Sequence, residues 1–273
     1  MNPPYVDVDN ARLAYFRRGD GPPVVLIQGV GVHGEGWRPQ VDALAGKYAC
    51  VWFDNRGVGR SQPPAQRLSV DRMVRDTAAI LDAVNWADAH VVGHSLGGLV
   101  ALRLALSAPD RVRSLSLLCT FARGRDAGAS ARMAWIGLRT RLGTRRMRRA
   151  AFLEILAPPN ALGGVDREQM ALAAAPLFGH DLADHPRIEG QQLAALRAED
   201  VTGELQRISA PTLVVSAAHD PIAPPALGRA LAAAIPGARH ELLSDQAHGA
   251  PILAPDIVNT LLLAHLDRVE AMK

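Results

Sequence analysis

The sequence predicts an α/β fold, with a mostly parallel eight-stranded sheet flanked by helices and an all-helical segment inserted before the last two strands. Short Val-rich apolar runs alternate with longer helix-patterned segments over most of the 273 residues. This alternation is typical of a sheet covered by helices on both faces. It stops between residues 121 and 200, where no segment has a strand pattern, and then resumes.

The first two strands are expected to differ from the others. Residues 5–10 and 12–18 alternate apolar and polar side chains across Asp9-Asn10, which indicates an antiparallel hairpin at one sheet edge. The remaining strands are expected at 22–29, 49–55, 89–95, 112–120, 210–220 and 238–245, and helices at 36–48, 69–85, 96–109, 224–236 and 254–269.

Residues 121–200 are expected to form a helical cap on a single core domain, which comprises residues 1–120 and 201–273. The strands on either side of the insertion follow one pattern, so they are expected to belong to one sheet. The cap helices are expected to break at glycines and prolines, namely Gly143, Pro158-Pro159, Gly163-Gly164, Pro176 and Pro186.

Composition narrows the function classes. No stretch approaches the roughly 18 uninterrupted apolar residues of a membrane span, and no signal segment opens the chain, so a cytoplasmic location is expected. Cys50 and Cys119 both lie in apolar strand-like context, which predicts buried thiols rather than a disulfide framework or a zinc site. No metal cluster is evident.

The formal net charge is only +3, but nine arginines fall between residues 123 and 149. Such a run can attract an anionic substrate, nucleic acid or an acidic membrane. No interleaved aromatic residues or nucleic-acid module accompany it, so no nucleic-acid partner is expected. A solvated helical face is the simpler interpretation.

A strand-to-helix turn at residues 93–97 carries the first chemical signal. Gly93, His94, Ser95, Leu96 and Gly97 match G-x-S-x-G between a β-branched run and a helical run. This context is that of a nucleophile elbow, which holds a serine clear of the backbone. The N-terminus of the following helix favours negative charge beside that serine.

A serine hydroxyl becomes nucleophilic when a base removes its proton and a carboxylate orients the base. Asp220 directly follows one downstream strand, and His248 lies in the loop after the next. Both are therefore expected at the same sheet edge as Ser95. Asp245 is a rival orienting residue. It lies in the same loop as His248, called the histidine loop below, and this position favours a role in the turn.

With these three residues in this order, the chain resembles capped α/β-hydrolase-fold serine hydrolases of the esterase, enol-lactonase and perhydrolase group. The resemblance rests on "LIQGVGVHGEGW", "FDNRGVGRS", "GHSLGG", "PTLVVSAAHDPIAP" and "DQAHGAP". It implies Ser95 as nucleophile, His248 as general base and acid, and Asp220 as orienting carboxylate. It also implies an oxyanion hole formed by the backbone N–H groups of Val30 and Leu96, and no cofactor.

Two features separate the chain from some relatives. The oxyanion loop begins Gln28-Gly29 where many relatives have His-Gly, so different hydrogen bonds are expected behind it. A serine at position 95, where dehalogenases and epoxide hydrolases have an aspartate, favours acyl substrates. The segment containing Asp54, Arg56 and Ser61 is expected to be a structural loop.

Further substrate contacts are less specific. His33, Trp37 and Trp135 are candidates, each weighed against a packing role, and His94 is expected to pack beside the elbow. The other candidate pocket walls from the cap are Met133, Ile136, Leu138, Met147, Phe152 and Leu156.

The predicted function is hydrolysis of a small-molecule ester or lactone through an acyl-enzyme, as in carboxylesterases and lactonases. Acyl transfer, perhydrolysis and carbon–carbon bond hydrolysis use the same triad and remain open alternatives. A ligand receptor that retains the triad is a further alternative from a different class.

Overall fold

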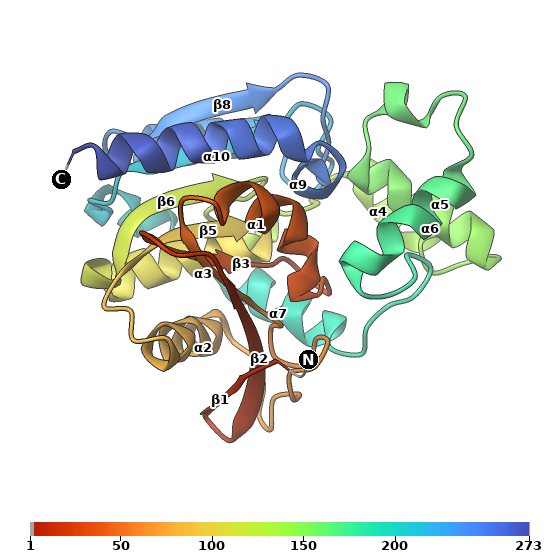
Figure 1. Ribbon diagram of the computed structural model, residues 1–273. Helices are drawn as coiled ribbons and strands as arrows, with labels where there is room; N and C mark the ends of the chain where they lie inside the picture. Colours follow the sequence, from red (N-terminus) through yellow and green to blue (C-terminus); the bar gives the residue numbers. More distant parts are fainter. Residues whose placement is uncertain (1–2, 273) are drawn as a thin grey trace.

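The structure is a computed structural model that describes residues 3–272. Eight strands form one sheet in the order β1-β2-β4-β3-β5-β6-β7-β8 (Figure 1). The pairs from β4 through β8 are parallel, whereas β1 and β2 join antiparallel, which confirms the predicted sheet. The strands are β1 Tyr5–Val8, β2 Ala11–Arg18, β3 Pro23–Ile27, β4 Ala49–Phe53, β5 Ala89–His94, β6 Val112–Leu118, β7 Thr212–Ala217 and β8 Arg239–Leu243.

The predicted edge hairpin forms from β1 and β2. Asp9 and Asn10 connect them with φ angles of 45° and 60°. Asp and Asn tolerate this left-handed backbone better than most residues, and a two-residue turn of this kind matches the twist of paired strands.

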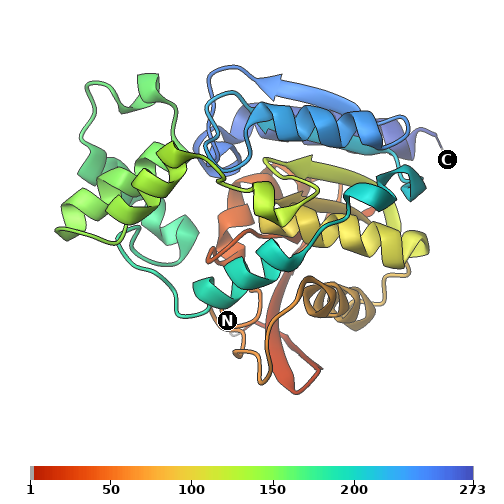
Figure 2. The ribbon, with the colours of Figure 1, turned by 180° about the vertical axis from the view of Figure 1, so that it is seen from behind.

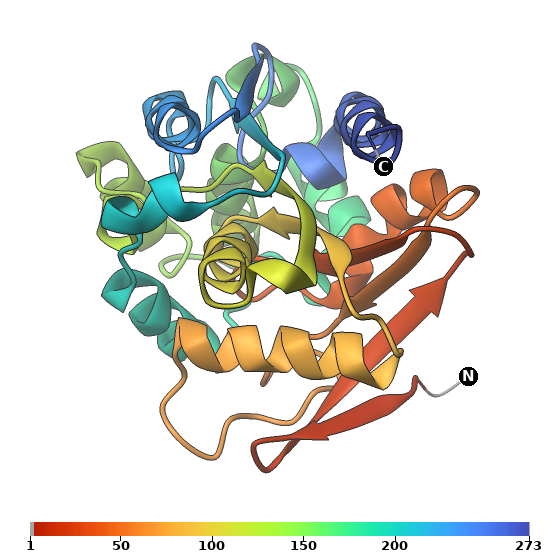
Figure 3. The same cartoon turned by 90° about the vertical axis from the view of Figure 1, so that its left-hand side faces the viewer.

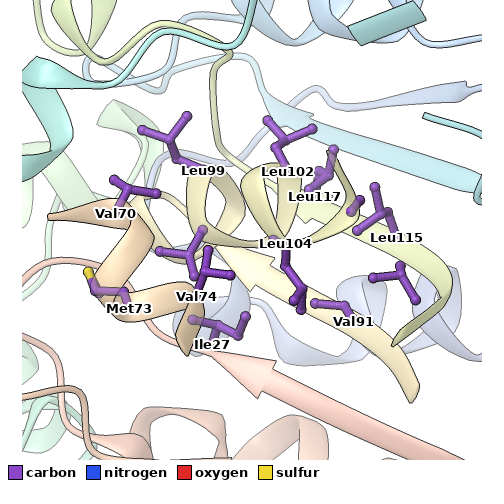
Figure 4. Close-up of a cluster of buried hydrophobic side chains, with 14 of the residues drawn as sticks. Ile27, Val70, Met73, Val74, Val91, Leu99, Leu102, Leu104, Leu115 and Leu117 are labelled. Carbon is purple, nitrogen blue, oxygen red and sulfur yellow. The ribbon is translucent and has the colours of Figure 1, made fainter. Parts of the chain in front are cut away.

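Helices cover both faces of the sheet (Figure 3). Along β3, Val25 and Ile27 belong to the core cluster with α2 and α3, while Val24 and Leu26 belong to the cluster with α1 and α10. This alternation follows from the two-residue period of a strand. Figure 4 shows the first cluster, in which α2 and α3 side chains pack on β3, β5 and β6. The helices are α1 Arg38–Leu44, α2 Val70–Ala83, α3 Leu96–Ser107, α8 Pro225–Ala234, α9 Ala250–Leu253 and α10 Pro255–Glu270.

Between β6 and β7 the chain forms α4 Ala131–Arg139, α5 Arg145–Leu156, α6 Arg167–Phe178 and α7 Glu189–Ala198. Helices α4 to α6 project from one side of the sheet in Figures 1 and 2. Within the described part of this segment, the isolated bridge between Arg123 and Asp200 is the one strand-like pairing. The predicted helix break at Pro176 is wrong, because α6 runs through it. Pro176 lies in the last turn, so the bond that it loses and any bend affect only the end of the helix, which stops at Phe178 before Gly179, with a φ of 79°.

Most arginines of the 123–149 run are held in ion pairs within this segment, which agrees with a solvated charged face. The pairs are Arg123 with Asp126, Arg139 with Glu154, Arg141 with Glu189, Arg145 with Asp184, Arg146 with Glu168, and Arg149 with Asp181 and Glu168.

Both cysteines are buried free thiols, as predicted. Across residues 3–272, no helix has both the length and the apolar character that a membrane crossing requires.

Candidate active site

The predicted elbow forms where β5 ends and α3 begins. Ser95 lies between them with φ 54° and ψ −119°, a conformation that strains a residue with a side chain by about 1–3 kcal/mol. Its N–H donates to the Leu118 carbonyl at 3.0 Å, and the Thr120 hydroxyl donates to the Ser95 carbonyl at 2.7 Å. These bonds from β6 and the loop after it hold the strained residue in place.

The two glycines of the motif are required by close backbone contacts. A Cβ atom at Gly93 would lie 2.4 Å from the Gly97 carbonyl oxygen, and one at Gly97 would lie 2.0 Å from that of Ile27. Both separations are far below van der Waals contact. Helix α3 can therefore approach β3 and β5 only with glycine at these positions.

Asp220 and His248 meet beyond the ends of β7 and β8. The Nδ1 of His248 donates to the Asp220 Oδ2 at 2.8 Å, and both side chains are buried. Asp245, the rival orienting residue, is exposed and accepts a hydrogen bond from Ser244. The structure thus brings His248 to Asp220 and leaves Asp245 outside.

The Asp220 carboxylate is stabilised in its ionised form. Burial acts to raise its pKa, but the charge and hydrogen bond of His248 and the backbone N–H groups of Ala223 and Ile222 outweigh burial and lower the pKa below its usual value. Both N–H groups donate to Oδ1 at 2.8 Å. The carboxylate can therefore hold the imidazole in one tautomer, with the proton on Nδ1.

A cavity of about 410 Å³ joins three of the predicted residues, Ser95, His248 and Val30, whereas Leu96 and Asp220 do not line it. Among the hydrogen bonds of residues 3–272, none joins the Ser95 hydroxyl to the His248 ring. The hydrogen bond between a catalytic nucleophile and its base is often long in a site without substrate and shortens when substrate binds.

The backbone N–H groups of Val30 and Leu96 are unpaired within residues 3–272. In the described part of the chain, neither donates to a protein acceptor, whereas the N–H groups of Gly29 and Gly31 on either side of Val30 do. Leu96 is the first residue of α3, where the helix leaves its N–H unpaired.

His94 packs beside the site, as predicted. Its Nε2 donates to the His248 carbonyl at 3.0 Å, and the two rings lie 4.8 Å apart. Burial, assisted by the nearby His248, lowers the pKa of His94 to about 3. His94 is therefore a neutral ring that helps to fix the histidine loop.

His33, Trp37 and Trp135 do not line the cavity. Trp37 is fully buried in the core, and His33 donates its backbone N–H to the Phe178 carbonyl at 3.1 Å. Trp135 is 60% exposed, because α4 turns its opposite face to the cavity. Trp37 and His33 therefore have packing roles, and Trp135 faces solvent.

Three of the other candidate cap residues, Met133, Phe152 and Leu156, do line the cavity. Ile136 is buried elsewhere, and Leu138 and Met147 are exposed. Sequence reasoning missed several lining residues, among them Phe178, Leu193, Ile222 and Ile252. No local motif marks them, since which side of each helix faces the cavity depends on packing.

A charged cluster lies at the part of the cavity formed by the helical segment. Glu189 accepts from the Arg141 guanidinium at 2.8 Å and pairs with His185 Nδ1 at 2.6 Å, while His185 Nε2 lies 3.1 Å from the Thr140 carbonyl. All four residues line the cavity. The cavity therefore combines apolar walls with internally paired charges.

The comparisons with known proteins agree with this architecture. Residues 22–255 match the alpha/beta hydrolase fold family. A protein of Azorhizobium caulinodans named "Putative carbamate hydrolase RutD" is 35% identical, covering 98% of this chain and 99% of that protein. The crystal structure of the enol-lactonase from Burkholderia xenovorans LB400 is 29% identical, with a TM-score of 0.81 and coverage of 97% and 100%. A hydrolase from Pseudomonas aeruginosa PA01 is 28% identical, with a TM-score of 0.81 over 96% and 97% of the two chains.

Proposed function

Because this chain belongs to the alpha/beta hydrolase fold family, we propose that it is a serine hydrolase that cleaves a carboxylic ester or a lactone. Ser95 is the proposed nucleophile, His248 the general base and acid, and Asp220 the residue that orients His248. The observation that carries the proposal is the strained Ser95 at a cavity it shares with a histidine held by a buried carboxylate.

The proposed reaction begins when the Ser95 hydroxyl oxygen attacks the acyl carbon and its proton passes to Nε2 of His248. The imidazolium, stabilised by Asp220, then gives that proton to the leaving alkoxide. Water then attacks the acyl-enzyme and gives a proton to His248, which passes it to the departing Ser95 oxygen as the carboxylic acid is released. For a lactone, both products remain one hydroxy acid.

The negative oxygen of each tetrahedral intermediate is proposed to bind the N–H groups of Val30 and Leu96. Donors held in place before the reaction are effective because they need no reorganisation when charge develops. Helix α3, whose N-terminus lies at Ser95, adds a favourable dipole.

The proposed substrate is a largely apolar acyl compound. Ligand pockets of roughly 300–1,000 Å³ suit drug-sized molecules, and the cavity of about 410 Å³ lies in this range. Apolar residues such as Phe152, Phe178 and Ile252 form much of its wall. One relative is named an enol-lactonase and another a carbamate hydrolase, and the cavity volume favours a substrate larger than a simple carbamate. Residues 121–200 are proposed as the cap, which supplies Phe152 and Phe178, whereas Ile252 comes from α9 of the core.

The test is the Ser95→Ala variant, assayed with p-nitrophenyl esters of graded acyl length, several lactones and a carbamate. Turnover should fall about a thousandfold or more, because loss of a triad member leaves only residual catalysis. A fluorophosphonate should label the unmodified protein and not the variant. Ser244→Ala, at an exposed serine, is the matched control and should keep full activity. Undiminished turnover by Ser95→Ala would refute the proposal.

A further inference from the structure

The loop that carries the Val30 N–H group is held from both sides. Before Val30, the Gly29 N–H donates to the Gln28 side-chain oxygen at 2.9 Å, and the Asn55 amide donates to the Gln28 carbonyl at 3.0 Å. The Gln28–Gly29 peptide plane is therefore bonded at both ends. After Val30, the Gly31 N–H donates to the Gln192 side-chain oxygen at 2.8 Å. The intervening plane, which contains the Val30 N–H, is thus suspended between two fixed planes.

Gln192 comes from the helical segment, 161 residues away in sequence from Gly31. It lies in α7, is completely buried and does not line the cavity. Within residues 3–272 its side-chain NH₂ has no hydrogen-bond partner. An unpartnered buried amide destabilises a fold, and an apolar side chain of the same size would avoid this penalty. Among the described residues, the one hydrogen bond of this side chain is the bond that it accepts from Gly31 in the loop.

We propose that Gln192 is a positioning residue of the oxyanion hole, an inference that rests on the proposed function. By accepting from Gly31, it fixes the peptide plane that follows Val30 and so limits rotation of the plane that holds the free Val30 N–H. Small displacements of such a donor weaken transition-state stabilisation more than substrate binding, because the oxyanion exists only during the reaction. Gln192 acts through Gly31 and touches no substrate.

The helical segment is accordingly part of the catalytic framework and more than a cover. It also bonds the histidine loop, since the N–H groups of His248 and Gly249 donate to the carbonyls of Ile155 and Leu156 at 3.3 and 3.0 Å. Movement of α5 or α7 away from the core would therefore disturb the two loops that hold the proposed base and the proposed oxyanion donor.

The experiment compares Gln192→Met, which removes the acceptor with little change in side-chain shape, with the unmodified protein on p-nitrophenyl butyrate. We expect kcat to fall about tenfold to a hundredfold, somewhat less than for loss of a whole oxyanion donor, with KM changed less than about threefold. Inhibition by a trifluoromethyl ketone, which mimics the tetrahedral intermediate, should weaken in parallel with kcat/KM. Inhibition by butyrate, the product, should not change. The thermal unfolding midpoint should change little, because the variant removes the unpaired amide NH₂ but also takes away the acceptor of the buried Gly31 N–H.

Gln191→Met is the control, because Gln191 is the exposed neighbour on the same helix. A Gln192→Met variant with kcat within twofold of the control would overturn the inference, as would equal weakening of both inhibitors. If this variant does not fold, Gln192→Leu is measured by the same criteria. The two proposals fail separately: an active Ser95→Ala refutes the serine mechanism, whereas an inactive Ser95→Ala beside a fully active Gln192→Met refutes only the role of Gln192.

Discussion

Replacing Arg56 with methionine is expected to lower the free energy of unfolding by about 3–5 kcal/mol, because it leaves a buried carboxylate without its partner. Arg56 follows β4, and its side chain is fully buried against that of Asp76 on α2. Its Nε and Nη2 donate to the two carboxylate oxygens at 2.7 and 2.6 Å. Nη2 also donates to the Val8 carbonyl at 2.8 Å, so this one side chain joins the edge hairpin to α2.

The same pair should add little stability over an apolar replacement. Burial raises the pKa of Asp76 despite the opposing charge and hydrogen bond of Arg56. At a pH above this raised pKa, the ionised carboxylate therefore destabilises the folded state. Replacing both charged side chains removes this destabilising contribution. The double variant Arg56→Met/Asp76→Leu should therefore lie within about 1–2 kcal/mol of the unmodified protein, with the residual loss coming from the Val8 carbonyl.

Urea unfolding of the unmodified protein, both single variants and the double variant, followed by circular dichroism, measures these free energies. The double-mutant cycle gives the coupling directly. If Arg56→Met alone loses less than about 1 kcal/mol, or if the double variant is no more stable than either single one, the reasoning about this pair is incorrect.

Four further outcomes are expected. Asp220→Asn should lower kcat about ten-thousandfold by releasing the His248 tautomer, which ester hydrolysis measures. Since the pKa of Asp220 is lowered on folding, its contribution to stability is present above its unfolded pKa and disappears as pH falls through the folded value. The stability gap between unmodified protein and Asp220→Asn should thus be larger at pH 7 than at pH 3 in urea titrations; equal gaps would contradict this. Thr120→Val should destabilise by about 1 kcal/mol through loss of its bond to the Ser95 carbonyl and reduce kcat, whereas full activity would show that the elbow needs no such support. Burial raises the pKa of Cys50 to about 12 and that of Cys119 well above its usual value, so a disulfide reagent should modify neither thiol in the native protein and both in urea.

The sequence by itself determined the features that depend on local chain geometry. The change of period at Ser95 located the elbow, and the positions of Asp220 and His248 after successive strands placed them at one sheet edge. Because parallel strands end on the same side, a strand assignment already predicts which loops meet. The hairpin at Asp9 follows in the same way from alternation and turn chemistry.

Only the tertiary structure decided how the helical segment faces the site. Helical periodicity allows Trp135 and Met133 on either side of α4, and packing turns Met133 to the cavity and Trp135 to solvent. It also brings Gln192 to Gly31, two residues without a shared motif or a short separation. The physical reason is that helix rotation and the meeting of distant loops are set by long-range packing, which leaves no periodic signal in the chain.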